Sequence, residues 1–170
     1  MRMEIVSLVL WAAVVSAQQP TDTPSALRVQ DNQKLLLKAH GTGTQIYTCK
    51  SGENGPAWTL KGPDALLFNA SGKLVVKHYA GPTWKSNDGS SIRGKVVANV
   101  PAPRPNAVPW LLLSAIDHEG NGVMTKVENV QRLHTEGGKA PATGCDSAHI
   151  GDNVSVHYQA DYYFYSAPAQ

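Results

Sequence analysis

The stretch Val154-Ser155-Val156-His157-Tyr158-Gln159-Ala160 alternates apolar and polar residues with a period of two. Successive side chains of a β-strand point to opposite faces, so this pattern places Val154, Val156, Tyr158 and Ala160 on one face. Similar apolar runs, separated by Gly, Pro, Asn or Asp, cover residues 34–40, 44–49, 57–60, 74–79, 92–100, 110–116, 123–134 and 154–165. These runs predict one all-β domain, a β-sandwich or flattened barrel of about 8–10 short strands with little helix.

The segments between the runs have the composition of turns. Gly and Asn accept positive φ angles, which favours turns at Gly41-Thr42-Gly43, Asn87-Asp88-Gly89 and Gly120-Asn121-Gly122. Residues 63–67, which begin with a proline, are predicted to form a single helical turn. The four prolines within residues 101–109 exclude a central strand there and indicate a crossover connection.

The composition limits the class of protein. Of the 170 residues, 42% are hydrophobic and 16% are charged, and the net charge is +2. This charged share is below the usual quarter, which argues against a disordered chain, a coiled coil or a charge-rich helical bundle. Lys and Arg are spread along the chain without a basic run, so nucleic acid is not an expected partner. The length suits a single domain.

The first residues have the pattern of a secretory signal peptide. Arg2 precedes an apolar run from Ile5 to Val15, and small residues end the segment at Ala17. The run is shorter than the roughly 20 residues that span a bilayer, and an uncleaved interfacial anchor is the alternative. The expected segments are a signal peptide (residues 1–17), an extended lead-in (18–33) and a single β-rich domain (34–167). We therefore expect a secreted or periplasmic protein without a membrane span after cleavage.

Cys49 and Cys145 are the cysteines of the chain. An even number of cysteines in an exported chain predicts a disulfide bond between them, because oxidising compartments preserve such bonds. Two buried free thiols are the alternative. Neither cysteine lies in a C-x-x-C pattern, so a catalytic thiol is not expected.

The residue patterns predict no metal or cofactor site. Asp117, Glu119, Asn121, Gly122 and Glu128 match positions of an EF-hand calcium loop, but prolines and an apolar run precede them where a helix is required. A polar hairpin turn is the preferred interpretation, and a looser calcium-binding turn is the alternative. The six histidines show no metal-site spacing such as H-x-H. They are His40, His78, His118, His134, His149 and His157.

The candidate ligand-binding residues are His78, Tyr79, Trp84 and Asp88. Glycine and proline interrupt the chain on both sides of Trp84, which would leave its indole partly exposed at a rim. Such a ring stacks on sugars and other flat ligands, while Asp88 or His78 would hydrogen-bond ligand hydroxyls. The alternative is a hairpin that buries Trp84 in the core.

Eight sequence blocks carry a resemblance to a known family. They are residues 45–49 (Gln-Ile-Tyr-Thr-Cys), 58–65, 78–84 (His-Tyr-Ala-Gly-Pro-Thr-Trp), 88–90, 108–113, 130–138, 144–145 and 158–165. In this order they resemble a secreted family known as domain of unknown function 3455. The resemblance implies export and a compact single domain, and it implies no activity. Some fungal relatives carry a malate dehydrogenase label, which this sequence does not support because it lacks a G-x-G-x-x-G turn and βαβ alternation.

A non-enzymatic binding or interaction protein outside the cytoplasm is the function that these features favour, with a glycan or cell-wall component as its ligand. The G-x-S-x-G elbow of hydrolases is absent from the sequence. A secreted hydrolase with a site near His78 and Asp88 is one alternative, and a structural or adhesion component of the cell exterior is another. A cleft with perturbed carboxylates or histidines would favour the enzyme, and a grooved aromatic face would favour the binder.

Overall fold

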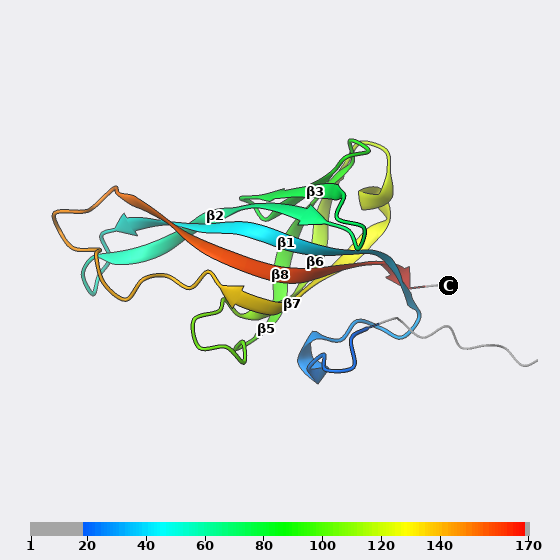
Figure 1. Cartoon of the computed structure of the whole chain (residues 1–170), viewed down its shortest axis with the longest axis horizontal. Helices are drawn as coiled ribbons and strands as arrows, with labels where there is room; N and C mark the ends of the chain where they lie inside the picture. The colour runs from blue at the N-terminus through cyan, green and yellow to red at the C-terminus, as the bar shows by residue number, and fades with distance from the viewer. Residues whose placement is uncertain (1–18, 169–170) are drawn as a thin grey trace, which may run out of the picture.

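Eight antiparallel strands of the described chain form a barrel in which each strand pairs with its neighbour in sequence and the last returns to the first (Figure 1). This computed structural model describes residues 19–168, so the predicted signal peptide lies outside the described residues. The strands are β1 (Gln33–Lys50), β2 (Ala57–Phe68), β3 (Leu74–Tyr79), β4 (Thr83–Ser86), β5 (Ser91–Val100), β6 (Trp110–Glu119), β7 (Val127–Gly137) and β8 (Asn153–Pro168). Two short 3-10 helices accompany them, η1 (Ser25–Leu27) and η2 (Val123–Lys126). The all-β prediction is confirmed, and of the two predicted forms, a β-sandwich or a flattened barrel, the structure has a barrel.

Strand β1 is much longer than the two short runs predicted in its place. The turn predicted at residues 41–43 is wrong, because these residues continue the strand and pair with both β2 and β8. The glycines allow close packing instead: a Cβ on Gly43 would overlap the carbonyl oxygen of Asp64, and one on Gly41 would lie 2.8 Å from the Tyr162 ring. The long β1, β2 and β8 extend together beyond the barrel body (Figure 1).

Three other local predictions are wrong. Residues 63–67 belong to β2 and form no helical turn. Pro63 is tolerated in this strand because it pairs with β1 on one side, while the pairing with β3 starts only at the next residue. Residues 101–109 form the loop of the β5–β6 hairpin instead of a crossover, since the two strands pair up to its ends. Residues 123–126, predicted to begin a strand, form η2.

The wall of the barrel is incomplete on one side, because the β3–β4 hairpin is short. Strand β2 pairs with β3 only from Asp64 onward, and β5 pairs with β4 only through residues 91–93. Residues 57–62 of β2 therefore pair with β1 alone, and residues 95–100 of β5 pair with β6 alone. We call the gap between these two segments the side opening; the β3–β4 turn at residues 80–82 borders it at one end.

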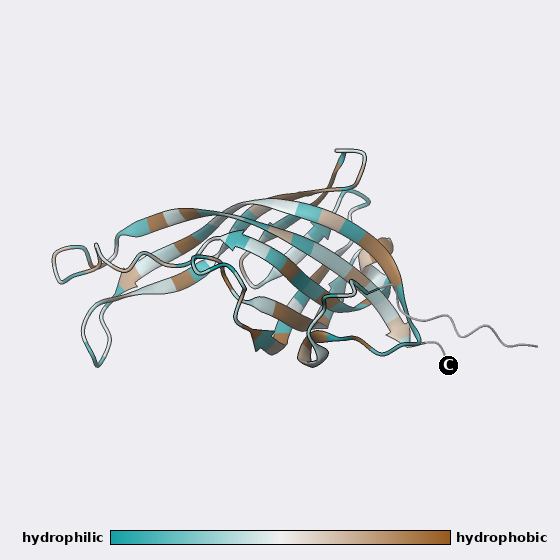
Figure 2. Ribbon diagram, turned by 60° about the horizontal axis from the view of Figure 1, so that its bottom comes forward, coloured by the Kyte–Doolittle hydropathy of each residue, from teal (hydrophilic) through white to brown (hydrophobic). Residues whose placement is uncertain are grey.

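The barrel interior holds the main hydrophobic core. Strand β8 contributes Tyr158, Ala160, Tyr162 and Phe164, which lie on one face as its period-two pattern predicts. These side chains pack in the same cluster as Trp84 of β4. Figure 2 shows the corresponding alternation of apolar and polar segments along the barrel strands.

The N-terminal segment packs on the outer face of the barrel. A second apolar cluster joins it to β6, β7 and β8, and its buried members are Leu27, Val29, Trp110, Leu133, Tyr163 and Tyr165. The buried Gln131 side chain fixes this contact: its Nε2 donates to Gln19 Oε1 at 2.9 Å and to the Leu27 carbonyl at 2.7 Å. The segment expected as an extended lead-in is therefore packed against the barrel from Gln19 onward.

A disulfide bond joins Cys49, at the end of β1, to Cys145, in the loop before β8, as the cysteine count predicts. The two Cα atoms lie 5.4 Å apart, and the bonded residues are 96 positions apart in sequence. Among residues 19–168, no helix has the length and apolar character needed to cross a membrane.

Candidate functional site

A cavity of about 260 Å³ lies at the side opening and reaches into the barrel. Its buried and partly buried polar side chains come from four different strands, which supply Gln45 (β1), His78 (β3), Trp84 (β4) and Arg132 (β7). Its apolar lining is formed by Leu60, Pro63, Pro82, Val96, Leu111 and Leu113. Residues far apart in the sequence therefore converge here only because the sheet closes into a barrel.

The mouth of the cavity is apolar. Leu60 and Val96 stand on the two strands that border the side opening, and they are 54% and 44% exposed. Leu113 and Trp84 lie at the buried end. A ligand that enters from the side would therefore pass an apolar rim before it meets the polar groups.

Three buried N–H groups at this cavity have no hydrogen-bond partner. They are Nε2 of Gln45, Nε1 of Trp84 and Nε of Arg132, and they are three of the five such side-chain atoms in the described part of the chain. Gln45 and Trp84 are each only 1% exposed. An unsatisfied buried donor costs about 1–3 kcal/mol, so a protein tolerates three at one place only where something offsets the cost.

Arg132 brings a positive charge to the cavity, and its guanidinium also interacts with the hydroxyl of Tyr162. One of its terminal nitrogens, Nη2, donates to the Pro109 carbonyl at 2.8 Å. None of the ion pairs found among residues 19–168 involves Arg132. Lys61 also lines the cavity, but its side chain is exposed at the rim.

His78 is held neutral inside the barrel. Its ring stacks on Trp84 with centroids 4.4 Å apart, and its Nδ1 donates to the Thr83 carbonyl at 2.9 Å. Burial lowers the pKa of His78 to about 3, and the nearby charge of Arg132 acts in the same direction. The neutral ring with a protonated Nδ1 leaves Nε2 as a hydrogen-bond acceptor.

The four residues predicted as a ligand site do not form one site. His78 and Trp84 line the cavity at the side opening. Tyr79 points the other way and lines a shallow pocket on the outer face. Asp88 lies in the β4–β5 turn and lines neither of these two pockets. Gln45 and Arg132, which the sequence analysis missed, complete the polar part of the cavity.

The predicted exposure of Trp84 is wrong. The β3–β4 hairpin turns this residue into the barrel, where it contacts Tyr162 and Phe164 edge to face. Gly94 on β5 makes room for the indole, since a Cβ there would lie 2.9 Å from its ring. The alternative, a hairpin that buries Trp84 in the core, is what the structure shows.

Asp88 has a structural role in joining two turns. Its Oδ1 accepts hydrogen bonds from the backbone and hydroxyl of Ser90, and its Oδ2 accepts one from the Val123 amide at 2.8 Å. The hydrogen bonds from Ser90, followed by that from Val123, lower the pKa of Asp88 to about 2. The carboxylate therefore links the β4–β5 turn to the start of η2.

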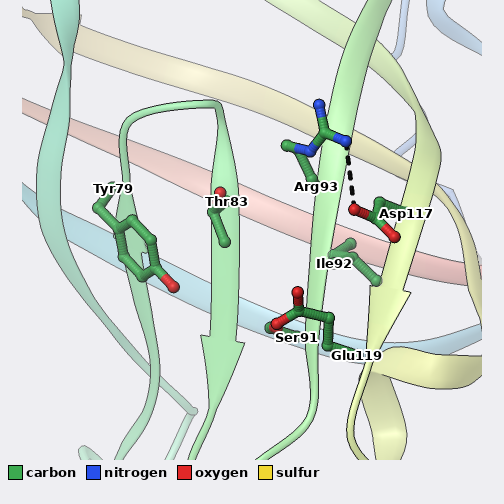
Figure 3. Close-up of a pocket in the computed structure, with 7 residues that line it drawn as sticks. All are labelled: Tyr79, Thr83, Ser91, Ile92, Arg93, Asp117 and Glu119. Atoms are coloured by element: carbon green, nitrogen blue, oxygen red, sulfur yellow. Dashed lines mark hydrogen bonds and ion pairs between the residues drawn. The ribbon is translucent and has the colours of Figure 1, made fainter.

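The outer-face pocket has a volume of about 180 Å³ and is lined by Tyr79 together with residues of β4, β5 and β6 (Figure 3). Arg93 and Asp117 form an ion pair across it, with Nη2 and Oδ2 3.2 Å apart. Asp117 and Glu119 belong to the calcium-like pattern, yet they lie on strand β6 instead of beside the α-helix that an EF-hand requires before its loop. In the described chain, no group of three His, Cys, Asp or Glu side chains is placed to hold a metal ion.

A chain of histidines and aspartates fastens the N-terminal segment to the barrel. His134 of β7 contacts two carboxylates: its Nδ1 lies 2.9 Å from Asp161, and its Nε2 lies 2.9 Å from Asp22. His40 contacts the other oxygen of Asp161, also at 2.9 Å. Burial lowers the pKa of His134, but the hydrogen bonds to Asp161 and Asp22 outweigh it and raise that pKa.

This contact should weaken as the pH rises. Because the folded-state pKa of His134 is raised, its contribution to stability is complete below the ordinary value of 6.5 and is lost as the pH rises through the raised value. Because the pKa of Asp161 is lowered by His40 and His134 against the effect of burial, its contribution is lost only as the pH falls below the ordinary 3.8.

The measurement is urea-induced unfolding of the wild type and of His134→Asn at a series of pH values, from below 3.8 to above neutral. Asparagine suits the positive φ of 50° at this position. We expect the difference in unfolding free energy between the two proteins to shrink above neutral pH. His157→Gln is the control, since His157 faces Thr42 and no carboxylate. A difference that stays constant with pH would contradict the assignment.

The comparisons with known proteins identify the family and nothing beyond it. No curated protein and no solved structure matches the chain. A family model described as "Protein of unknown function (DUF3455)" matches residues 30–166, which include strands β1 to β7 and all but the last two residues of β8. This range also includes the cavity with its polar residues from Gln45 to Arg132. The chain therefore belongs to the DUF3455 family.

Proposed function

We propose that this protein is a non-enzymatic binding protein of the extracytoplasmic space that holds a small molecule inside its barrel. The observation that carries the proposal is a cavity with an apolar mouth whose lining includes three residues that each carry an unpartnered buried N–H group. Ligand sites in proteins are mostly apolar, with a few polar groups that fix orientation. The cavity volume of about 260 Å³ lies just below the range of roughly 300–1,000 Å³ for drug-sized ligands, which favours a smaller molecule.

The chemistry of the lining supports binding in preference to hydrolysis. The residues around the cavity supply hydrogen-bond donors, a neutral imidazole and apolar surface, with no hydroxyl, thiol or carboxylate side chain among them. Nδ1 of His78 is engaged with the Thr83 carbonyl. Hydrolysis near His78 would need a nucleophile or a water-activating carboxylate, and Asp88, the partner predicted from the sequence, is engaged with Ser90 and Val123.

A small molecule fits this site better than the glycan predicted from the sequence. The glycan prediction depended on an exposed indole face at Trp84, and this ring is buried and stacked on His78. The disulfide bond supports an oxidising location, and the signal-like residues 1–17 support export. Glycans therefore enter the binding assay as the competing ligand class.

The assay is a titration followed by ¹H–¹⁵N NMR, in which the indole N–H of each tryptophan gives its own signal. The probes are two matched series, one built on phenylacetic acid and one on hexanoic acid, each used as the carboxylate, the carboxamide and the corresponding primary alcohol. Cello- and chito-oligosaccharides form the glycan arm. We expect probes of the two series to shift the Trp84 indole signal and to leave that of Trp58 in place.

Two matched variants on β6 locate the binding. Leu111→Trp adds bulk to the cavity wall and should weaken probe binding by about tenfold or more. Ile116→Trp adds the same side chain at an exposed position outside the cavity and should leave binding unchanged. The proposal fails if no probe of either series shifts the Trp84 signal, or if only the oligosaccharides bind and Leu111→Trp leaves them unaffected.

A further inference from the structure

We infer that the ligand of this cavity is a small monocarboxylate with an apolar body, and that Arg132 selects it. The inference rests on the proposed binding function and adds the chemical class of the ligand. It follows from the kind of polar group left without a partner, from the balance of charge in the lining, and from the shape of the apolar wall.

The fully buried side-chain atoms without a partner on the lining residues are all donors, and the Nε2 of neutral His78 adds an acceptor beside them. The amide Nε2 of Gln45, the indole Nε1 of Trp84 and the Nε of Arg132 each carry hydrogen and no accepting lone pair. A ligand that satisfies them must therefore offer oxygen acceptors. A carboxylate provides two oxygens with about four accepting directions, whereas a hydroxyl accepts two and a carboxamide brings donors of its own.

The positive charge in the cavity lining favours an anionic ligand. Arg132 is partly buried, its guanidinium is always charged, and no carboxylate side chain lines the cavity to balance it. Burying a charge without a partner is costly, and a bound carboxylate would supply that partner. The second cation, Lys61, stands in solvent at the rim, where its attraction is screened. One partly buried positive charge thus matches one negative charge.

Guanidinium geometry adds a preference for a planar anion. The Nη2 of Arg132 donates to the Pro109 carbonyl, and the Nε of the same guanidinium has no hydrogen-bond partner. Charge-assisted hydrogen bonds between a guanidinium and a carboxylate are roughly twice as strong as neutral ones. The neutral His78 beside this site adds no second buried charge, so a dianion would lack a matching partner.

The apolar body of the ligand would contact the apolar side chains of the cavity wall. The wall between the buried donors and solvent is formed by Pro63, Pro82, Leu111, Val96 and Leu60. With a volume of about 260 Å³, the cavity has room for one ring or a short chain behind the head group. The carboxylate would lie at the buried end, beside Trp84 and Gln45, and the apolar body would point toward the side opening.

The experiment uses the same two probe series and needs no variant for its first result. Wild-type protein should bind phenylacetate and hexanoate at least about tenfold more tightly than the matched carboxamides and alcohols. The signals of the Trp84 indole and of the Arg132 Nε–H should move together. Equal affinity for all three head groups would overturn this inference and leave the proposed function standing, whereas absence of binding by every probe would overturn both.

Variants then assign the selectivity to one residue. Arg132→Gln should bring the affinities for carboxylate and carboxamide within about threefold of each other, while the alcohols bind as before. Lys61→Gln removes a charge at the rim and should keep the preference for carboxylate. If Arg132→Gln does not fold, Arg132→Lys tests the same point, because it keeps the charge without the guanidinium and should lose most of the preference. A preference that survives in Arg132→Gln or Arg132→Lys would overturn the assignment.

Discussion

Replacing Trp84 with alanine should lower the free energy of unfolding by about 3–5 kcal/mol, the usual cost of truncating a buried aromatic side chain. The indole is buried in the barrel, stacked on His78 and in edge-to-face contact with Tyr162 and Phe164. Such ring pairs add about 0.5–1.5 kcal/mol each beyond the area they bury. Urea-induced unfolding followed by circular dichroism, extrapolated to zero denaturant, measures the loss.

Trp58→Ala is the matched control for this experiment. Trp58 lies half-buried on the extended part of β2, where its Nε1 donates to the Thr143 carbonyl at 2.9 Å. Its removal should cost about 1 kcal/mol, the value of one typical hydrogen bond and limited packing. If the two variants lost equal stability, Trp84 would not be the core residue described here.

Removing the disulfide bond, with Cys49→Ala and Cys145→Ala together, should lower the free energy of unfolding by about 4–5 kcal/mol. The bonded residues are 96 positions apart, and the chain-entropy model assigns about this value to a loop of roughly 100 residues, because the open chain gains that much freedom when it unfolds. Alanine is suited to the buried Cys49 position because it introduces no polar atom. The measurement is again urea-induced unfolding.

The bond itself is tested first, by alkylation and intact mass with and without reductant. Wild-type protein should take up alkylating reagent only after reduction. Reduced wild type and the double variant should then unfold at the same urea concentration, since both lack the same cross-link. Two reactive thiols in unreduced protein, or a loss below about 1 kcal/mol, would contradict the prediction.

Much of the fold can be predicted from local sequence, and the strand boundaries cannot. Period-two alternation in β8 and the Asn87-Asp88-Gly89 turn identify antiparallel strands correctly. Gly41 and Gly43 have the composition of a turn, yet they permit close contact with residues of β8 and β2 that are distant in sequence. The sequence alone does not distinguish a glycine that is needed for close packing from one that is needed for a positive φ, because the difference depends on the tertiary structure.

The sequence predicted only part of the site, and it predicted an exposed rim where the structure has a cavity. His78 and Trp84 were identified from the unusual residues around them, although as an exposed rim. Arg132 gave no signal, because β7 is covered by the barrel core on one face and by the N-terminal segment on the other. A strand buried on both faces loses the alternation that tells which side chains point inward. Gln45 lies next to a register shift after Ile46, which local patterns also do not reveal.

The side opening has a consequence for self-association. A fully closed barrel has no free strand edge, but here two edge segments expose backbone groups that an extended segment of another chain would pair with. The residues at these edges oppose such pairing: Lys61 and Lys95 place charges there, and Pro63 lacks an amide hydrogen. A register shift between Val96 and Ala98 also makes the β5 edge irregular. The gap through which the proposed ligand would enter thus also makes protection against aggregation a requirement of this sequence.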